Sequence, residues 1–315
     1  MVIHSVGPTL LTDWHQSPNV TAIVWAGLPG QESGNSITDV LYGRINPAGR
    51  SPFTWGATRE SYGTDVLYEP NGPIPQQDFS EGVFIDYRHF DKTNQTPVYE
   101  FGHGLSYTTF GYSDIRVEKS GAGEYVPTSG QTAAAPSFGN FSTNLTDYLF
   151  PSRDFPHVWQ FIYPYFNTSA SAAEASRDPD YGQTADKFMP PGALDGSPQK
   201  LLRSSGKSSP GGHRQLYDVM YTVTATITNT GKVVGDEVPQ LYVALGGPDD
   251  PPVVLRNFDR IRLEPNANAT FRGTLTRRDL SNWDTYRQDW VISSYPKRVY
   301  VGSSSRKLHL SANLA

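Results

Sequence analysis

The chain has 315 residues, a length that suggests about two domains, each large enough to bury a core. Charged residues make up 18% and the formal net charge is −5, which argues against binding to nucleic acid or an anionic membrane. No apolar run approaches the ~18 residues of a membrane span. The chain has no cysteine, which excludes disulfides and thiolate chemistry within it. We therefore expect a soluble chain with no nucleic-acid or membrane partner.

The first 57 residues have an α/β pattern. The run "VTAIVWAG" (20–27) is almost continuously apolar, as expected for a strand in a parallel sheet that is covered on both faces. "LPGQESGN" follows, and then comes an apolar stripe at helical spacing, formed by Ile37, Val40, Leu41 and Ile45. "NPAGRSPFTW" predicts a turn and a further strand, which completes a βαβ unit. "MVIHSV" resembles the start of a strand and has no signal-peptide features, so we expect that Met1 is not the natural start.

The stretch "GVFIDYRHFDKTNQTPVYEFGHGLSYTTF" (82–110) is dense in aromatic and charged residues. Such density is typical of a working site or of a surface packed beneath other segments. We expect that the aromatic rings of this stretch pack beneath neighbouring segments, and a sugar contact by one ring is the alternative. Four charged residues are expected to pair around the rings: Asp86, Arg88, Asp91 and Glu100.

From about 119 to 215 the composition shifts to Ser, Ala, Gly and Pro, which buries too little apolar area to offset the entropy of ordering. Within it lies "DYLFPSRDFPHVWQFIYPYF" (147–166), which is too aromatic for a tether. We interpret this segment as an arm that docks on another surface.

From residue 216 the apolar pattern has a period of two, which predicts a half-buried antiparallel strand followed by about six more short strands. Seven strands in about 100 residues are typical of an immunoglobulin-like sandwich. We expect residues 216–315 to hold a full set of strands and to fold independently. A two-residue turn at 287–288 would place Trp283 and Trp290 diagonally on one face, as a core pair and not a sugar platform.

Motifs for phosphate binding, a serine-hydrolase elbow and an H-x-x-x-H metal site are absent, so the sequence predicts no cofactor and no metal. Glu32 follows the carboxyl end of an apolar strand, where α/β sheets bind ligands. Glu32 and Asp39 share one helix, however, and an acid in the first turn of a helix commonly only compensates the helix dipole. We favour that structural role.

N-glycosylation sequons are the clearest indication of the compartment. The acceptor residues of the six sequons are Asn19, Asn94, Asn140, Asn144, Asn167 and Asn268. A few triplets would arise by chance, but six favour a secretory route, although the chain itself has no signal peptide.

Several long motifs follow one another in order: "VIHSVGP", "VTAIVWAGLPGQESGNSITDVLYGRINPAGRSPFTW", "FSEGVFIDYRHFD", "PVYEFGHGLSYTTF" and "DEVPQLYV…VLRNFDRIRLEP…LTRRDLSNWD". Together they closely resemble the C-terminal part of fungal β-glucosidases of glycoside hydrolase family 3. The resemblance extends over nearly the whole chain, including the aromatic insertion.

The resemblance implies a partial α/β sandwich followed by a fibronectin type III-like sandwich. In that family a TIM-like barrel precedes these domains, and two carboxyl groups hydrolyse terminal β-linked glucose with retention. The nucleophile is an aspartate in the barrel, and the acid/base is a glutamate in an "SGEG"-like loop shortly before the strand that here reads "VIHSVGP". Neither motif is present, so no catalytic residue of the family transfers to this chain.

The sequence thus predicts three regions: 1–118 as the C-terminal part of the α/β sandwich domain, 119–215 as an insertion with a docking arm, and 216–315 as the fibronectin-like domain. The favoured function is the C-terminal portion of a secreted β-glucosidase, inactive alone, which meets its β-glucoside only together with the missing barrel half. Homo-oligomers are compatible with this interpretation. The alternative is a non-catalytic carbohydrate-associated or scaffold module.

Overall fold

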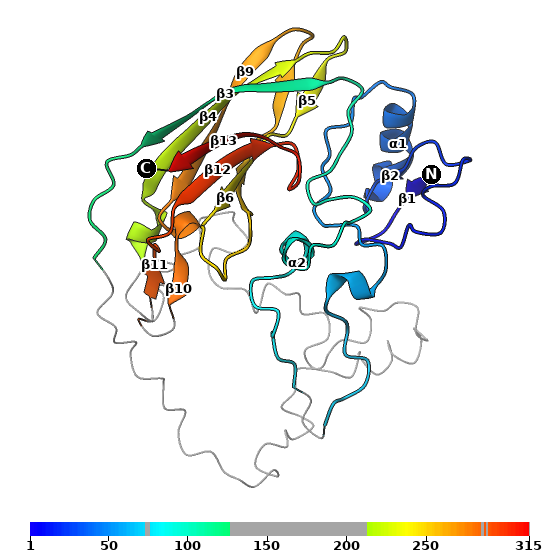
Figure 1. Ribbon diagram of the computed structural model, residues 1–315. Helices are drawn as coiled ribbons and strands as arrows, with labels where there is room; N and C mark the ends of the chain where they lie inside the picture. The colour runs from blue at the N-terminus through cyan, green and yellow to red at the C-terminus, as the bar shows by residue number, and fades with distance from the viewer. Residues whose placement is uncertain (73–75, 127–212, 285–286, 288, 315) are drawn as a thin grey trace, which may run out of the picture. The chain divides into compact units, whose positions relative to one another are not determined.

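The computed structural model describes residues 1–72, 76–126, 213–284, 287 and 289–314 (Figure 1). All of them belong to one compact unit, which joins Met1–Gly130 with His213–Ala315. The aromatic arm predicted at 147–166 lies outside the described residues, as do three of the predicted glycosylation sites: Asn140, Asn144 and Asn167. The predicted mixture of an α/β region and an all-β sandwich is confirmed.

The N-terminal region contains the strand–helix succession that the sequence predicts. Strands β1 (Val2–Ile3) and β2 (Val24–Trp25) pair in parallel, and helix α1 (Ser33–Leu41) follows β2 through the 3-10 turn η1 (Gly30–Glu32). No residue of α1 is buried, although Ile37 and Val40 on its apolar stripe are half-buried. The predicted third strand is wrong: within the described residues it is reduced to one antiparallel bridge between Trp55 and Tyr99.

Three aromatic rings form the packed centre of this region. Phe53 contacts Trp25 edge-on, with ring centroids 5.0 Å apart, and tilts against Trp55 at 5.1 Å. Trp25 and Trp55 meet edge to face at 6.5 Å. Such edge contacts let three large rings share a small volume. The chain continues through η2 (Glu60–Tyr62) and α2 (Tyr87–Lys92).

The sandwich consists of a four-stranded and a three-stranded sheet, with orders β13-β12-β6-β7 and β3-β4-β9. Two small two-stranded sheets, β5-β8 and β10-β11, accompany them. The strands and 3-10 turns of this part are β3 (Phe110–Lys119), η6 (Arg214–Tyr217), β4 (Val219–Asn229), β5 (Gly235–Glu237), β6 (Gln240–Ala244), β7 (Val254–Phe258), β8 (Ile261–Leu263), β9 (Asn268–Thr276), η7 (Arg278–Leu280), β10 (Asn282–Asp284), β11 (Asp289–Val291), β12 (Lys297–Gly302) and β13 (Leu308–Leu314).

The alternating pattern of β4 produces the sandwich core. Tyr221, Val223, Ala225 and Ile227 are all buried, and they pack with side chains from both main sheets. Phe271 on β9 lies directly opposite Ala225 and is fully buried. The prediction of a half-buried strand with apolar residues on one face is therefore confirmed.

The prediction that residues 216–315 hold every strand of the sandwich is wrong. β3 pairs antiparallel with β4 along most of its length, from Phe110 opposite Asn229 to Lys119 opposite Tyr221. β4 is therefore a central strand, with β3 on one side and β9 on the other (Figure 1). We propose that the sandwich domain starts with β3, before the insertion, and not after it at 216.

The tryptophan pair differs from its prediction in register and in burial. Trp283 and Trp290 lie directly opposite each other across β10 and β11, not diagonally, because the connecting loop has four residues instead of two. Their rings meet edge to face at 5.9 Å, and Trp283 is 47% exposed. The pair stabilises a surface hairpin and is not part of the core.

None of the helices in the described part of the chain combines the length and the apolarity that a membrane crossing requires. Within the same residues, no group of three or more His, Asp or Glu side chains is arranged to hold a metal ion.

Candidate functional site

The most strongly built polar site is a buried ion pair that joins the N-terminal region to the sandwich. Arg50 Nη2 lies 2.8 Å from Glu237 Oε2, and the two side chains are only 9% and 3% exposed. The Tyr112 hydroxyl donates to the other carboxylate oxygen at 2.6 Å. Burial and the neighbouring Glu237 charge raise the pKa of Tyr112, so its proton stays in this hydrogen bond. We call the contact between the N-terminal region (residues 1–107) and the sandwich the seam; Arg50 on one side and Glu237 and Tyr112 on the other lie in it.

Gln240, at the start of β6, forms the second polar link of the seam. Its Nε2 donates to the carbonyls of Gly102 (3.1 Å) and Ser303 (2.8 Å), and its Oε1 accepts from the Tyr242 hydroxyl at 2.5 Å. Gly102 has a φ of +79°, and a Cβ there would lie 2.2 Å from Gln240 Oε1. Only glycine therefore allows the chain to approach Gln240 so closely.

Aromatic residues of the 82–110 stretch form the apolar part of the seam. Tyr87 stacks on Phe101, with centroids 4.7 Å apart, and meets Tyr242 edge to face at 6.3 Å. The Tyr87 hydroxyl accepts a hydrogen bond from the Leu255 N–H at 3.0 Å. Tyr87 and Phe90 are buried, so the expectation that rings of this stretch pack beneath other segments is confirmed for these two.

The three acids among the four charged residues of that stretch do have bonded partners, as expected, and most of these partners lie outside the stretch. Asp86 accepts from the backbone N–H and the hydroxyl of Thr54, both at 2.9 Å. Asp91 pairs with Arg306 at 3.0 Å, and Glu100 accepts from the Ser304 hydroxyl at 2.9 Å. Arg88 Nε is buried and has no hydrogen-bond partner in the described part of the chain. The three acids are thus bound by segments distant in sequence: Asp86 by Thr54, and Asp91 and Glu100 by the 303–307 turn.

The environment of Glu100 makes the seam sensitive to acid. The interaction with the His103 imidazole, whose Nδ1 lies 3.6 Å away, is the largest of the effects that lower the pKa of Glu100 to about 2. The Ser304 hydroxyl adds to this effect. Because the pKa is lowered by folding, the carboxylate stabilises the fold above the unfolded value near 4.5, and this contribution disappears as the pH falls toward 2.

We expect Glu100→Gln to lower the free energy of unfolding most above pH 5 and to have little effect near pH 2. Urea unfolding of both proteins across this range, followed by tryptophan fluorescence, measures the difference. Lys307→Gln is the matched control, since Lys307 Nζ lies 3.7 Å from Glu100 and the side chain is 54% exposed. A loss for Glu100→Gln that stays constant down to pH 2 would show that the Glu100 carboxylate is not specifically stabilised.

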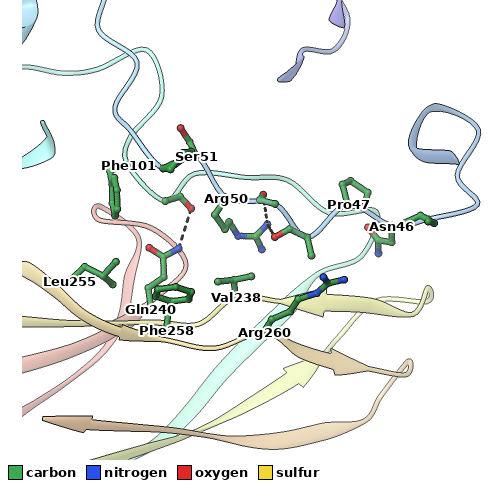
Figure 2. Close-up of a pocket in the computed structure, with 15 residues that line it drawn as sticks. Asn46, Pro47, Arg50, Ser51, Phe101, Val238, Gln240, Leu255, Phe258 and Arg260 are labelled. Carbon is green, nitrogen blue, oxygen red and sulfur yellow. Dashed lines mark hydrogen bonds between the residues drawn. The ribbon is translucent and has the colours of Figure 1, made fainter. Parts of the chain in front are cut away.

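A pocket of about 450 Å3 opens between the 45–52 segment and the sandwich (Figure 2). Its wall is mostly apolar, with Phe101, Val238, Leu255 and Phe258 among the lining residues. Both arginines in the wall are bonded to carboxylates: Arg50 to Glu237, and Arg260, through Nε at 2.5 Å, to Asp236. Among the described residues, no Asp, Glu or His lines it, so these residues do not supply the paired carboxyls of glycoside hydrolysis.

The acids considered from sequence lie on the surface of α1. Glu32 precedes α1 and accepts from Asn35 Nδ2 at 2.7 Å, while Asp39 pairs with the exposed Arg44 at 3.2 Å. Glu32 makes no hydrogen bond that caps α1, and the first turn of α1 holds no acid, so compensation of the helix dipole remains a prediction. Of the predicted glycosylation sites in the described residues, Asn19, Asn94 and Asn268 are all exposed.

Two parts of the chain match known families of protein domains. Residues 1–107 match the glycosyl hydrolase family 3 C-terminal domain, and residues 237–305 match the fibronectin type III-like domain. These two matches confirm the resemblance of its motifs to the C-terminal part of family 3 enzymes.

Its relatives are fungal β-glucosidases. The probable β-glucosidase A of Aspergillus fumigatus is 59% identical over 318 residues, which cover 100% of this chain and 36% of the relative. Among solved structures, a family 3 β-glucosidase from Neurospora crassa is 67% identical with a TM-score of 0.74, and the match covers 100% of this chain and 38% of the other. A Chaetomium thermophilum β-glucosidase is 63% identical with the same TM-score, covering 100% and 37%. The chain spans just over a third of the length of these relatives.

Proposed function

We propose that the chain forms the C-terminal part of a secreted, retaining β-glucosidase that hydrolyses terminal β-D-glucosyl residues, as in cellobiose, and that its role there is structural. The observation that carries this proposal is the match of the entire chain to fungal β-glucosidases at 59–67% identity. The resemblance assigns the two catalytic carboxyls to the barrel part of such an enzyme.

The buried acids of this chain support a structural role. Among the described residues, the buried carboxylates are Asp236, Glu237 and Asp289. Each has a bonded partner: Arg260 for Asp236, Arg50 for Glu237 and the Tyr125 hydroxyl for Asp289. Asp236 and Glu237 are neighbours in β5 and so point to opposite faces of the strand. These partners within the chain support a structural role, although Asp289 Oδ2 has no hydrogen-bond partner in the described part of the chain.

The N-terminal region also has the surface expected of a domain that packs against more protein. Only four apolar side chains of residues 1–107 are buried in the described structure: Leu11, Trp55, Tyr87 and Phe90. Many more are exposed there, among them Val6, Leu28, Leu41, Tyr42, Ile45 and Leu105. Exposed apolar area on this scale is typical of an interaction surface. The remaining two thirds of a β-glucosidase would cover it.

If the enzyme is secreted by a eukaryote, the exposed Asn19, Asn94 and Asn268 are accessible acceptors for glycans. Their exposure supports the proposed secretory route, together with the three sequons outside the described residues.

The purified 315-residue chain is expected not to cleave 4-nitrophenyl β-D-glucoside above background. Without the nucleophile and the acid/base it lacks the covalent step and its proton transfer, which provide much of the rate enhancement of such enzymes. The assay needs material from a host without glycosidases, with an intact relative as the positive control. Turnover that persists through purification and scales with the chain would overturn the structural role.

A further inference from the structure

Three arginines from separate elements lie together at the edge strand of the four-stranded sheet. Arg88 belongs to α2, Arg256 to the edge strand β7 and Arg278 to η7. Within the described ranges, none of the three forms an ion pair or donates a hydrogen bond to another residue. We call these three side chains the arginine cluster.

Contacts around Tyr87 bring Arg88 and Arg256 to the same place. The guanidinium carbon of Arg88 lies 5.8 Å from the centroid of the Tyr87 ring. The hydroxyl of that ring accepts from the Leu255 N–H at 3.0 Å, one residue before Arg256. Arg256 is also left unpaired by a shift in the pairing of β7 with β6. Such a bulge turns a side chain out of the regular ladder of a sheet.

Arg278 completes the cluster from the other side of Arg256. It is exposed, and its guanidinium carbon lies 4.8 Å from the centroid of the Trp290 ring. Burial lowers the pKa of Arg256, Asp279 opposes this change, and the charges of Arg88 and Arg278 add to it. Charges that act on one another in this way are close in space. Three guanidiniums against one carboxylate leave an excess of two positive charges.

The outer nitrogens of the cluster are open to a ligand. Arg88 Nε and Arg256 Nε are buried, whereas the Nη groups of both side chains retain accessible surface and have no partner in the described part of the chain. The buried Nε atoms hold the two guanidiniums in place. Like charges held together without a counter-ion repel, so an anion that accepts from the Nη groups would stabilise the arrangement.

The charge and the donors favour a doubly charged oxyanion. The planar fork of a guanidinium matches the spacing of the oxygens of phosphate and sulfate. A dianion balances the excess of two positive charges, whereas a single carboxylate would leave one of them.

We propose that the arginine cluster binds a phosphate or sulfate group through the Nη groups of Arg88 and Arg256, with Arg278 at the outer edge. The group is either the free anion or an ester on a sugar, since both present the same oxygens. This site takes no part in glucoside hydrolysis and does not depend on the function proposed above.

Inorganic phosphate near pH 8, where it is mostly a dianion, tests the proposal. We expect saturable binding to the full chain in a phosphorus NMR titration at constant ionic strength. Arg256→Gln should weaken binding by about tenfold, because it removes a charge and its donors. Arg278→Gln changes an exposed side chain and should weaken binding by about threefold, so it still decides if Arg256→Gln does not fold. Arg272→Gln is the matched control, since Arg272 is an exposed arginine of β9 opposite Thr224 and outside the cluster.

Two further ligands define the chemistry that is recognised. Acetate at the same ionic strength should bind about tenfold more weakly than phosphate, because it has one charge. Glucose 6-phosphate that binds more tightly than phosphate assigns the group to a sugar ester, and equal or weaker binding assigns it to the free anion. The site would be overturned by the absence of saturable phosphate binding, by acetate binding as tightly as phosphate, or by equal effects of Arg256→Gln and Arg272→Gln.

Discussion

Arg50→Met is expected to lower the free energy of unfolding by about 3–5 kcal/mol, because it leaves a buried carboxylate without its cation. Glu237 is only 3% exposed, and the Tyr112 hydroxyl alone would then bond it. Methionine retains much of the arginine volume, so the loss reports the missing charge more than a cavity. Urea unfolding at pH 7 measures it.

Two further variants show whether the loss comes from the buried ion pair. Arg44→Met is the matched control, since Arg44 is 76% exposed beside Asp39, and surface pairs contribute about 0–1 kcal/mol. Arg50→Met combined with Glu237→Gln should regain part of the loss, because the glutamine needs no counter-ion. A loss below about 1 kcal/mol for Arg50→Met would show that water reaches the pair and that the seam is open in solution.

Residues 213–315 expressed alone are expected not to fold cooperatively. Without β3, the strand β4 becomes an edge along the length that now pairs from Phe110 to Lys119. Tyr112, Ile115 and Val117 of β3 also pack against the sandwich core and would be lost. An exposed long strand edge favours association with other chains. Thermal unfolding followed by circular dichroism would show no sharp transition, or aggregation.

The control for this fragment is the full chain cut once between β3 and β4, so that β3 is still present. A specific protease site placed after Ser208, once cut, leaves one piece with β1, β2 and β3 and a second piece with β4 to β13. We expect the two pieces to elute together from a sizing column and to unfold in one transition. Contrary evidence would be a 213–315 fragment as stable as the intact chain, or pieces that separate without denaturant.

Local patterns of the sequence predicted local structure well. The alternation from Tyr221 to Ile227 predicts one buried face of β4 because side chains of a strand point alternately to its two sides. The apolar run at 20–27 likewise predicts β2 and its parallel pairing, although only Val24 and Trp25 have strand geometry. The order of the long motifs indicated the resemblance to family 3 β-glucosidases.

Contacts between distant segments could not be predicted in this way. Arg50 and Glu237 are 187 positions apart, and neither lies in a pattern that marks an ion pair. β3 precedes its partner β4 by a long insertion, which hid its place in the sheet. The Trp283–Trp290 register depended on the length of one loop, and a change of two residues moved the pair from diagonal to opposite. Such features depend on the packed fold, which single-segment patterns do not encode.

An exchange experiment tests the central claim most directly. In the Aspergillus fumigatus relative, the matching 36% of the chain would be replaced by residues 1–315, with the relative truncated before that part as the control. We expect the chimera to hydrolyse 4-nitrophenyl β-D-glucoside and the truncated relative not to, because the exchanged part completes the packing of the enzyme without supplying its catalytic carboxyls. A chimera that is folded and monodisperse but has no turnover would contradict the claim that this chain is the C-terminal part of a β-glucosidase.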